Sequence, residues 1–382
     1  MSENEKTSAV AATLIFTSWG LYYSFTRRYL SVELEGGTRL VMLIAGLEWF
    51  FTLFAVLSAD LSGRIGIKRT ILAGMSGSTL FIIATRVKDA TLLALTLALS
   101  SFTWSLSWPA IVSAILSKSA SPGKTYSIFT IGSGAGYSLG SITMGFSYEI
   151  AGSEGVLLLI SLLYALGYFL LLILIPDSRE LSGDSVSRSL RSIASMREIF
   201  PILIGFSLTV LSRELFYSVA PSKLTSDIRT LFPSASESFE RSLFGVFFGG
   251  LMILLSMPSR YLAGVLADRY DPLKILIITN LSYLTIYWLF IETVGLIPIV
   301  LWQIPLYPFL DVSINTYIVK RSSRELVTLG LGVVLLFTAV GGLLQLAVLA
   351  SSLTDPVSIG VVITTAISIS TAILVKTVRS KT

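Results

Sequence analysis

The feature that most constrains this chain is a succession of long apolar segments separated by short polar connections. Each segment runs for about 20 residues, the length that an α-helix needs to cross the hydrocarbon core of a bilayer. Of the 382 residues, 53% are hydrophobic and 13% are charged, and a soluble protein cannot bury that much apolar surface. The apolar runs are continuous and do not alternate with polar residues, so they indicate membrane-spanning helices and not barrel strands.

The segments predict an all-α polytopic membrane protein with 12 transmembrane helices. Their approximate bounds are 8–30, 39–60, 69–87, 90–117, 125–147, 155–176, 199–221, 242–266, 273–291, 296–319, 326–350 and 357–376. A long polar connection divides them into an N-terminal half at 1–176 and a C-terminal half at 199–382. Within that connection, 177–198, apolar residues recur at helical spacing opposite two arginines, which predicts a short amphipathic helix on the membrane surface.

Lysine and arginine are distributed unevenly over the connections. If the N-terminus is inside, the inner connections hold most of these residues, so we expect both termini in the cytoplasm and a multi-pass protein of the cell membrane. This bias explains the net charge of +5 without a nucleic-acid partner. Glu3 and Glu5 precede the first apolar segment, which is too long for a signal-peptide core and is interpreted as the first helix.

Several residue types and patterns are missing from the sequence. Cysteine and histidine are both absent, which excludes disulfides, thiol chemistry and histidine-based metal sites. No G-x-x-x-x-G-K-[ST] pattern occurs, so transport driven by ATP is disfavoured. No polar region is large enough for a soluble catalytic domain. We therefore expect no enzyme activity, no metal and no cofactor.

A charged turn occurs twice, each time after the second apolar segment of a half. The later copy runs from Gly264 through Asp268 and Arg269 to Lys274, and the earlier copy is the run 61–69. Two copies at matching places indicate an internal duplication, and repeated halves that move about a central site are common among transporters.

The later turn carries a motif that identifies a resemblance to the major facilitator superfamily over nearly the whole chain. The family motif G-x-L-A-D-R-x-x-x-x-K is matched by Gly264, Leu266, Ala267, Asp268, Arg269 and Lys274; the earlier copy matches at Leu61, Ser62, Arg64, Gly66 and Lys68. In the earlier copy Gly63 occupies the aspartate position, and Asp60 lies one turn before it. The resemblance implies twelve helices, a central cavity and alternating access.

The same resemblance implies a cytoplasmic gate made by the two charged turns. Its expected members are Asp268, Arg269, Lys274, Asp60, Arg64 and Lys68. An aspartate at the end of one helix and cations at the start of the next can pair and stabilise helix ends. Alternatively, the cations are ordinary positive-inside anchors, although an acid such as Asp268 adds nothing to orientation.

Glycines recur every fourth residue in the fifth apolar segment. Gly132, Gly136 and Gly140 lie on one helix face, where small residues let two backbones approach closely. We expect this face to pack against the other half. Antiporters of the family often carry a Gly-Pro motif here, and Tyr137 in place of the proline weakens that inference.

Arginines inside apolar segments are costly in lipid and usually face a cavity. Arg213 lies 14 residues beyond Ile199, or ~21 Å along a helix at about 1.5 Å per residue, still inside the ~30 Å core. Of Arg27 and Arg28, one is expected to reach the outer surface and the other to face the cavity opposite Arg213. An arginine from each half suits an anion, because the guanidinium binds carboxylate or phosphate through two hydrogen bonds.

This pair of arginines locally resembles the organic phosphate antiporters of the superfamily. Tyr22 and Tyr23, just before Arg27, add to that likeness and are expected at the substrate site. Trp108-Pro109 and Tyr307-Pro308 hold matching places in the two halves, and their prolines predict bent helices that face each other with Trp108 and Tyr307 in the cavity. Packing or a place at the membrane interface is the alternative for these aromatic residues.

Three acids also lie inside apolar segments. Glu48 is about ten residues into its segment, ~15 Å deep, Glu214 follows Arg213, and Asp311 lies four residues before Asn315 and so on nearly the same face. Because histidine is absent, these carboxyls are the expected proton carriers, and Asn315 is a further candidate for substrate binding. The alternatives are ion pairs of Glu48 and Glu214 with the arginines, and a helix–helix hydrogen bond for Asp311.

The leading hypothesis is a monomeric secondary active transporter that moves a small organic anion, driven by exchange or by protons or another counter-transported ion. A second hypothesis keeps the fold but makes the protein a proton-coupled exporter of hydrophobic or cationic compounds. A third is a transporter-like receptor that binds a ligand without moving it. The transport hypotheses share a small-molecule substrate and the lipid bilayer as partners.

Overall fold

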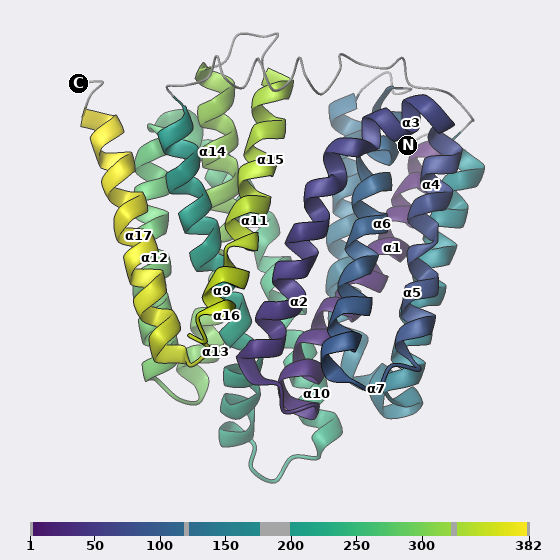
Figure 1. Cartoon of the computed structure of the whole chain (residues 1–382), viewed down its shortest axis with the longest axis horizontal. Helices are drawn as coiled ribbons and strands as arrows, with labels where there is room; N and C mark the ends of the chain where they lie inside the picture. The colour runs from purple at the N-terminus through teal and green to yellow at the C-terminus, as the bar shows by residue number, and fades with distance from the viewer. Residues whose placement is uncertain (1–2, 118–121, 176–198, 322–326, 380–382) are drawn as a thin grey trace.

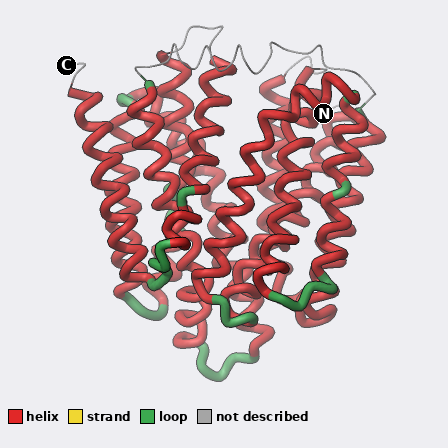
Figure 2. The backbone as a smooth tube through the Cα atoms, viewed as in Figure 1, coloured by secondary structure: helices red, strands yellow, loops and turns green. Residues whose placement is uncertain are grey.

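The computed structural model describes the backbone of residues 3–117, 122–175, 199–321 and 327–379. Side chains are described over the same ranges except at 3–6, 59–60, 116–117, 122–127 and 327–331. Helices joined by short loops make up these ranges, and no strand occurs in them (Figure 2). The predicted connection at 177–198, with its amphipathic helix, lies outside the described residues.

The helices before residue 176 begin with α1, which runs over nearly all of the first predicted segment. Their bounds are α1 Glu3–Arg28, η1 Tyr29–Glu33, α2 Gly37–Thr52, η2 Leu53–Leu57, α3 Ser58–Ile65, α4 Ile67–Met75, α5 Gly77–Ala84, α6 Ala90–Ser117 and α7 Pro122–Leu174. The short η1 is a π-helix and η2 a 3₁₀-helix. Within α7, Gly152 has a φ of 64°, which no helix interior allows, so α7 is two helices joined at this residue.

The helices after residue 198 begin with α9, which is buried along most of its length. Their bounds are α9 Phe200–Leu231, α10 Glu237–Gly245, η3 Val246–Gly250, α11 Leu251–Arg269, α12 Pro272–Glu292, α13 Leu296–Trp302, α14 Tyr307–Arg321, α15 Val327–Leu343, α16 Gln345–Ala350 and α17 Pro356–Arg379. The η3 segment is a π-helix between α10 and α11. Polar caps begin two of these helices, since the Ser236 hydroxyl accepts from the Phe239 amide and the Asp271 carboxylate from the Leu273 amide.

Ten helices in the described ranges are long and apolar enough to cross a membrane. Most of their bounds lie within about six residues of the predicted segments, but Phe200–Leu231 extends ten residues beyond the predicted end at 221. Ile128–Leu174, with 47 residues, covers two of the predicted segments. The prediction of a helical, polytopic membrane protein is therefore confirmed. Exposed leucine, isoleucine and phenylalanine side chains cover the outside of these helices, as a surface in contact with lipid requires.

The chain forms two groups of helices (Figure 1). The helices before residue 176 lie on one side of the molecule and those after residue 198 on the other. We call these groups the first half and the second half. Both termini lie at one end, called the near end, and η1, α10 and the loop before α10 lie at the opposite end, called the far end.

The repeated glycines of α7 bring its backbone against α1. A Cβ atom at Gly136 would lie 2.2 Å from the Thr13 carbonyl oxygen, and one at Gly140 would lie 2.0 Å from that of Thr17. Close packing through this face is present, but its partner is α1 of the same half, and the expectation of packing against the other half is wrong for these glycines. Two other glycines of α7 meet the second half: a Cβ atom at Gly134 would lie 2.6 Å from the end of the Met257 side chain of α11, and one at Gly145 would meet Ser242 of α10.

Candidate functional site

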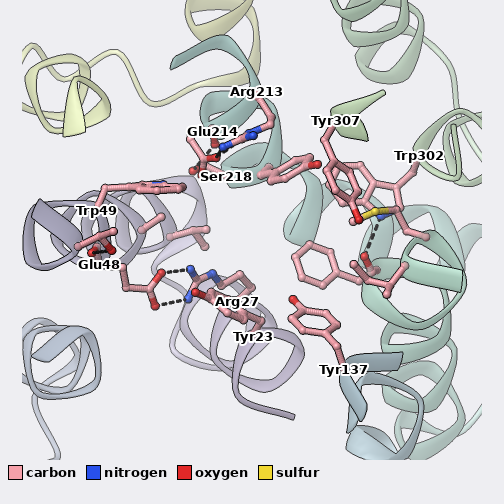
Figure 3. Close-up of a pocket in the computed structure, with 17 residues that line it drawn as sticks. Tyr23, Arg27, Glu48, Trp49, Tyr137, Arg213, Glu214, Ser218, Trp302 and Tyr307 are labelled. Atoms are coloured by element: carbon pink, nitrogen blue, oxygen red, sulfur yellow. Dashed lines mark hydrogen bonds and ion pairs between the residues drawn. The ribbon is translucent and has the colours of Figure 1, made fainter. Parts of the chain in front are cut away.

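A cavity of about 320 Å³ lies between the two halves (Figure 3). We call it the charged lobe, because its wall holds two arginines and two glutamates among aromatic rings. The residues that line it come from α1, α2, α7, α9, η3, α11, α13 and α14: Tyr23, Arg27, Val41, Ala45, Glu48, Trp49, Thr52, Tyr137, Arg213, Glu214, Tyr217, Ser218, Phe248, Met252, Ile253, Trp302 and Tyr307. Concave sites with apolar walls and a few polar groups are typical of small-molecule binding.

Arg27 and Glu48 form an ion pair between α1 and α2 on one wall of the charged lobe. Two parallel hydrogen bonds join them, one of 3.0 Å from Nη1 to Oε1 and one from Nη2 to Oε2. The Tyr22 hydroxyl donates to the same Glu48 oxygen at 2.6 Å, and the guanidinium lies 4.6 Å from the centre of the Tyr23 ring. Both charged residues are buried. Such a fork-to-carboxylate pair is strong and holds the guanidinium in one orientation.

Arg213 enters the charged lobe from the second half. Its Nε donates to the carboxylate of Glu214, its neighbour on α9, at 2.9 Å, and its Nη1 lies 3.6 Å from Asp311 Oδ1 on α14. Figure 3 shows Arg213 and Glu214 across the cavity from Arg27 and Glu48. When both are ionised, the charges of Arg27 and Glu48 cancel, whereas the single positive charge of Arg213 lies near two carboxylates.

A broken helix completes the wall in the second half. Helix α13 ends at Trp302 and α14 begins at Tyr307, and the four residues between them are not helical. Pro305 and Pro308 lack the amide hydrogens that a continuous helix would use. The π-helix η3 lies against this break, and its carbonyls at Phe248 and Phe247 accept hydrogen bonds from Trp302 Nε1 at 3.0 Å and Gln303 Nε2 at 2.9 Å. Broken helices inside a membrane are tolerated where they line a cavity.

A second hollow of about 280 Å³ adjoins the charged lobe. We call it the aromatic lobe, because tryptophan, tyrosine and phenylalanine rings make most of its wall. Its lining residues are Phe16, Trp19, Tyr23, Trp49, Thr52, Ala55, Ser101, Trp104, Ser105, Trp108, Pro109, Tyr137 and Leu335. Tyr23, Trp49, Thr52 and Tyr137 belong to both lobes, so the two hollows share a wall.

The structure divides the predicted substrate residues among several places. Arg27, Arg213, Tyr23 and Tyr307 line the charged lobe, and Trp108 lines the aromatic lobe. Other predicted residues, namely Tyr22, Arg28 and Asn315, line neither lobe.

Each of these three has its own surroundings. Tyr22 is buried behind the Arg27–Glu48 pair. Arg28 turns to the far end, where it contacts Glu33 and Glu240. Asn315 lies one turn beyond Asp311 on α14.

Of the predicted proton carriers, Glu48 and Glu214 line the charged lobe, and Asp311 contacts Arg213. The ion pairs considered as the alternative for Glu48 and Glu214 are present.

The charged turns lie at the near end and do not line either lobe. Asp268, Arg269 and Lys274 are exposed, and Asp268 forms no ion pair with any described side chain. Lys320 at the end of α14 donates to the Ala267 carbonyl at 2.8 Å, which satisfies the last turn of α11. In the earlier copy Arg64 is exposed and Lys68 is partly buried, while the side chain of Asp60 lies outside the described residues.

Sequence reasoning missed several residues of the site. Trp49 follows Glu48 on α2 and lines both lobes, and Tyr137 was noted only for the missing proline. Arg260 of α11 lies 5.2 Å from the centre of the Tyr307 ring. One signal was available, since Trp19, Tyr23 and Arg27 are four residues apart and so share one face of α1.

Comparison with known proteins gives a family and a fold. A model of the Major Facilitator Superfamily matches residues 8–346. Three solved structures are similar over almost their full lengths. The nucleoside transporter NupG has a TM-score of 0.76 and 12% identity, and the match covers 98% of this chain and 99% of that chain. A POT family transporter in complex with 5-aminolevulinic acid has a TM-score of 0.73 and 14% identity, with 99% of this chain and 97% of that chain covered. A bacterial homolog to the human lysosomal transporter Spinster, inward-facing and unoccupied, has a TM-score of 0.68 and 14% identity, with 99% of this chain and 96% of that chain covered. At these identities the likeness shows the fold alone. No curated protein matches the sequence.

Proposed function

This chain belongs to the Major Facilitator Superfamily and is a transporter rather than an enzyme, and we propose that it carries a small organic solute with an anionic group by alternating access. One observation supports this choice of substrate: two buried arginines, one from each half, line the same cavity. An anionic group held between Arg27 and Arg213 contacts both halves at once. Its binding energy is then sensitive to their relative movement, as alternating access requires.

Coupling to protons follows from the partner of Arg27. Glu48 occupies the two guanidinium hydrogen bonds that a substrate carboxylate or phosphate would use. Protonation of Glu48 removes the charge that holds Arg27, so proton binding and anion binding favour each other, which is positive coupling between two sites. Glu214 and Asp311 are placed to act in the same way on Arg213. We therefore assign the three carboxyls as proton carriers and Arg27 and Arg213 as substrate ligands.

We assign the topology from helix length and charge. The helix α7 has 53 residues, ~80 Å at about 1.5 Å per residue, which is enough to cross a ~30 Å core twice, with Gly152 at the turn. Counting α7 as two spans and adding α1 to the remaining helices gives twelve spans. Because lysines and arginines are concentrated in the connections at the near end, we infer that both termini lie in the cytoplasm and that the membrane is the cell membrane. We take the functional unit to be the monomer, since each chain holds a complete cavity.

Counterflow into proteoliposomes, with a panel of carboxylates, phosphates and amines, tests the anion assignment. Arg213→Gln removes a charged hydrogen-bond donor worth about 1.5–3 kcal/mol, so we expect uptake of the best anion at low concentration to fall roughly 10- to 100-fold. Arg86→Gln, at an exposed position between α5 and α6, is the matched control and should leave uptake unchanged. Unaltered anion uptake by the Arg213 variant would rule out this site.

A second candidate is a proton-coupled exporter of cationic compounds. The observation that favours it is the second carboxylate beside Arg213, since Asp311 lies 3.6 Å from a guanidinium that already pairs with Glu214. Asp311→Asn separates the two candidates. Loss of amine transport with anion transport retained supports the exporter, and the reverse pattern supports the anion transporter. Counterflow of either kind of solute excludes a receptor that binds without transport.

A further inference from the structure

The aromatic lobe is walled by rings that already hold one another in place. Trp104 and Trp108 of α6 stack with centroids 4.1 Å apart, and Phe16 of α1 lies edge-on to both at 5.7 and 5.3 Å. Trp19 is also edge-on to Trp104, at 5.4 Å. Where the lobes meet, Tyr23 and Tyr137 lie nearly parallel, with an interplanar angle of 28°. A cavity with such fixed aromatic walls suits a flat ring, which gains from stacked and edge-to-face contacts.

Two polar groups in this wall lack a hydrogen-bond partner. Trp19 and Ser105 are 4% and 2% exposed and both line the lobe, yet within the described part of the chain neither Trp19 Nε1 nor Ser105 Oγ makes a hydrogen bond. By contrast, the Ser107 hydroxyl on the same helix is satisfied, at 2.7 Å from the Tyr168 hydroxyl. A buried donor without a partner costs about 1–3 kcal/mol, so its presence in a cavity wall calls for an explanation.

We propose that the aromatic lobe binds a flat heteroaromatic ring whose acceptor atoms receive hydrogen bonds from Trp19 Nε1 and Ser105 Oγ. This proposal rests on the transport of an anion proposed above and names its class: a heteroaromatic anion, with its charged group in the charged lobe beside Arg27 and Arg213. The shared wall of Tyr23, Trp49, Thr52 and Tyr137 lets one molecule occupy both lobes. An aliphatic anion would leave both donors unpaired and the rings without a stacking partner.

Three acids of similar size separate the contributions to binding. Pyrazine-2-carboxylate offers a flat ring with two acceptor nitrogens, benzoate a flat ring with none, and cyclohexanecarboxylate neither. Calorimetric titration of the purified full-length transporter measures their affinities without depending on transport. We expect the affinities to fall in that order.

The variant Ser105→Ala removes one donor with little change of shape. The variant Trp19→Phe removes the other donor together with part of a buried ring, so its effect is measured relative to benzoate. A neutral hydrogen bond is worth about 0.5–1.5 kcal/mol, so Ser105→Ala should weaken pyrazine-2-carboxylate roughly 2- to 10-fold and leave benzoate unchanged. Trp19→Phe should weaken pyrazine-2-carboxylate by a similar factor more than it weakens benzoate. The matched control, Ser107→Ala, lies on the same helix but has its hydroxyl bonded to Tyr168, and should alter neither affinity. The melting temperature without ligand should not fall in Ser105→Ala, because the removed hydroxyl has no partner among the described residues.

Two results would overturn the proposal. One is an equal loss of benzoate and pyrazine-2-carboxylate binding in both donor variants, which would show a general disturbance of the wall. The other is failure of all three acids to bind while another anion is still transported through Arg213, which would leave the anion site intact and refute the ring site. Loss of transport for every anion would instead refute the proposed function.

Discussion

The two ends of this transporter are held in different ways. At the far end, six charged residues form one cluster that joins the halves: Arg28, Glu33, Arg229, Glu237, Glu240 and Arg241. Backbones also meet there, since a Cβ atom at Gly245 would lie 2.2 Å from the Ser141 carbonyl oxygen. At the near end Asp268, Arg269 and Lys274 are exposed. Among ion pairs whose two side chains are both described, those that join the halves belong to the far-end cluster.

The difference shows where the free energy of this conformation is concentrated. Removing one partner of a buried, hydrogen-bonded charge pair is strongly destabilising, because it leaves the other charge buried and uncompensated. Exposed charges contribute little, with a median of about 0–1 kcal/mol per pair. Among the side chains that the structure describes, Asp268, Arg269 and Lys274 of the family motif therefore form no ion pair that joins the halves. We propose that in an alternating-access cycle this motif acts in the opposite state, when the far end is open.

The largest effect is expected from Glu240→Gln. Glu240 accepts hydrogen bonds from Arg28 and, at 2.6 Å, from Arg229, and it is 7% exposed. Losing its charge should cost the far-closed state about 3–5 kcal/mol, the range for a broken buried ion pair. Because the chain has no native cysteine, a cysteine introduced by Ser31→Cys in η1 can report opening of the far end. The rate of its labelling by a maleimide should rise at least tenfold in the Glu240→Gln variant, since ~1.4 kcal/mol corresponds to a factor of ten.

The matched control for that experiment is Glu237→Gln. Glu237 pairs with Arg241 in the same cluster, but its side chain is 57% exposed. Labelling should change less than threefold, in line with about 0.2–1 kcal/mol for an exposed pair. Equal labelling rates in the two variants would contradict the assignment of the buried charges as the main hold on this end.

Alanine substitution of one glycine near each end allows the packing of the two ends to be compared. A Cβ atom at Gly145 would lie 2.3 Å from the Ser242 amide nitrogen, whereas one at Gly264 in the near-end turn meets nothing within 4 Å. Gly145→Ala should therefore cost the far-closed state about 1–3 kcal/mol of overpacking and speed Ser31→Cys labelling. Gly264→Ala should be neutral or slightly stabilising, because alanine favours helix. Thermal unfolding of both variants measures this difference, and a greater loss for Gly264→Ala would reverse the comparison.

A smaller effect is expected at the near end from Asp268→Asn. Asp268 is exposed and unpaired among the described side chains, so its loss should change the free energy of unfolding by no more than about 0.5 kcal/mol. If the turn acts in the far-open state, counterflow should slow while stability is kept. We also expect Asp268→Asn to favour the near-open population more than Asp60→Asn does. Labelling of an engineered near-end cysteine tests this order, and equal shifts would argue against it.

The smallest effect is expected from pH at the far end. Burial raises the pKa of the Glu33 carboxyl, but the hydrogen bond from Arg241 and the charges of Arg28 and Arg241 outweigh it and hold the pKa below its ordinary value. When the far end is open and Glu33 is separated from its partners, its carboxyl has the ordinary pKa of about 4.3. The ionised carboxyl therefore stabilises the closed far end above this pH, and its contribution is lost as the pH falls through the lower pKa that Glu33 has in the closed cluster. Ser31→Cys labelling, corrected for thiol ionisation, should be flat from pH 8 to about 5 and rise only in stronger acid. Glu33→Gln should abolish this rise of the labelling rate in acid. A rise of the labelling rate near neutral pH would show that another titrating group controls the opening.

Local patterns predicted most of the fold and only part of the site. Span positions follow from local apolar length, and the depth of Arg213 follows from helix rise, so both could be counted from the sequence. Which of Arg27 and Arg28 faces the cavity could not be predicted from the sequence. Adjacent residues on a helix point about 100° apart, and only the surrounding helices decide what each side chain contacts. Arg28 has its partner Glu240 212 residues away in the chain, in a helix whose place is set by packing.

The sequence by itself determined that this protein crosses the membrane many times and belongs to the Major Facilitator Superfamily, because hydrophobic length and charged-turn motifs are properties of short stretches of chain. Tertiary structure alone decided that α7 packs its glycines against α1 and that Glu48 holds Arg27. It also decided that Trp19 and Ser105 line one hollow without hydrogen-bond partners among the described residues. These are contacts between residues far apart in the chain. Their energies depend on burial and on which groups are brought within hydrogen-bond distance, and no local pattern records either.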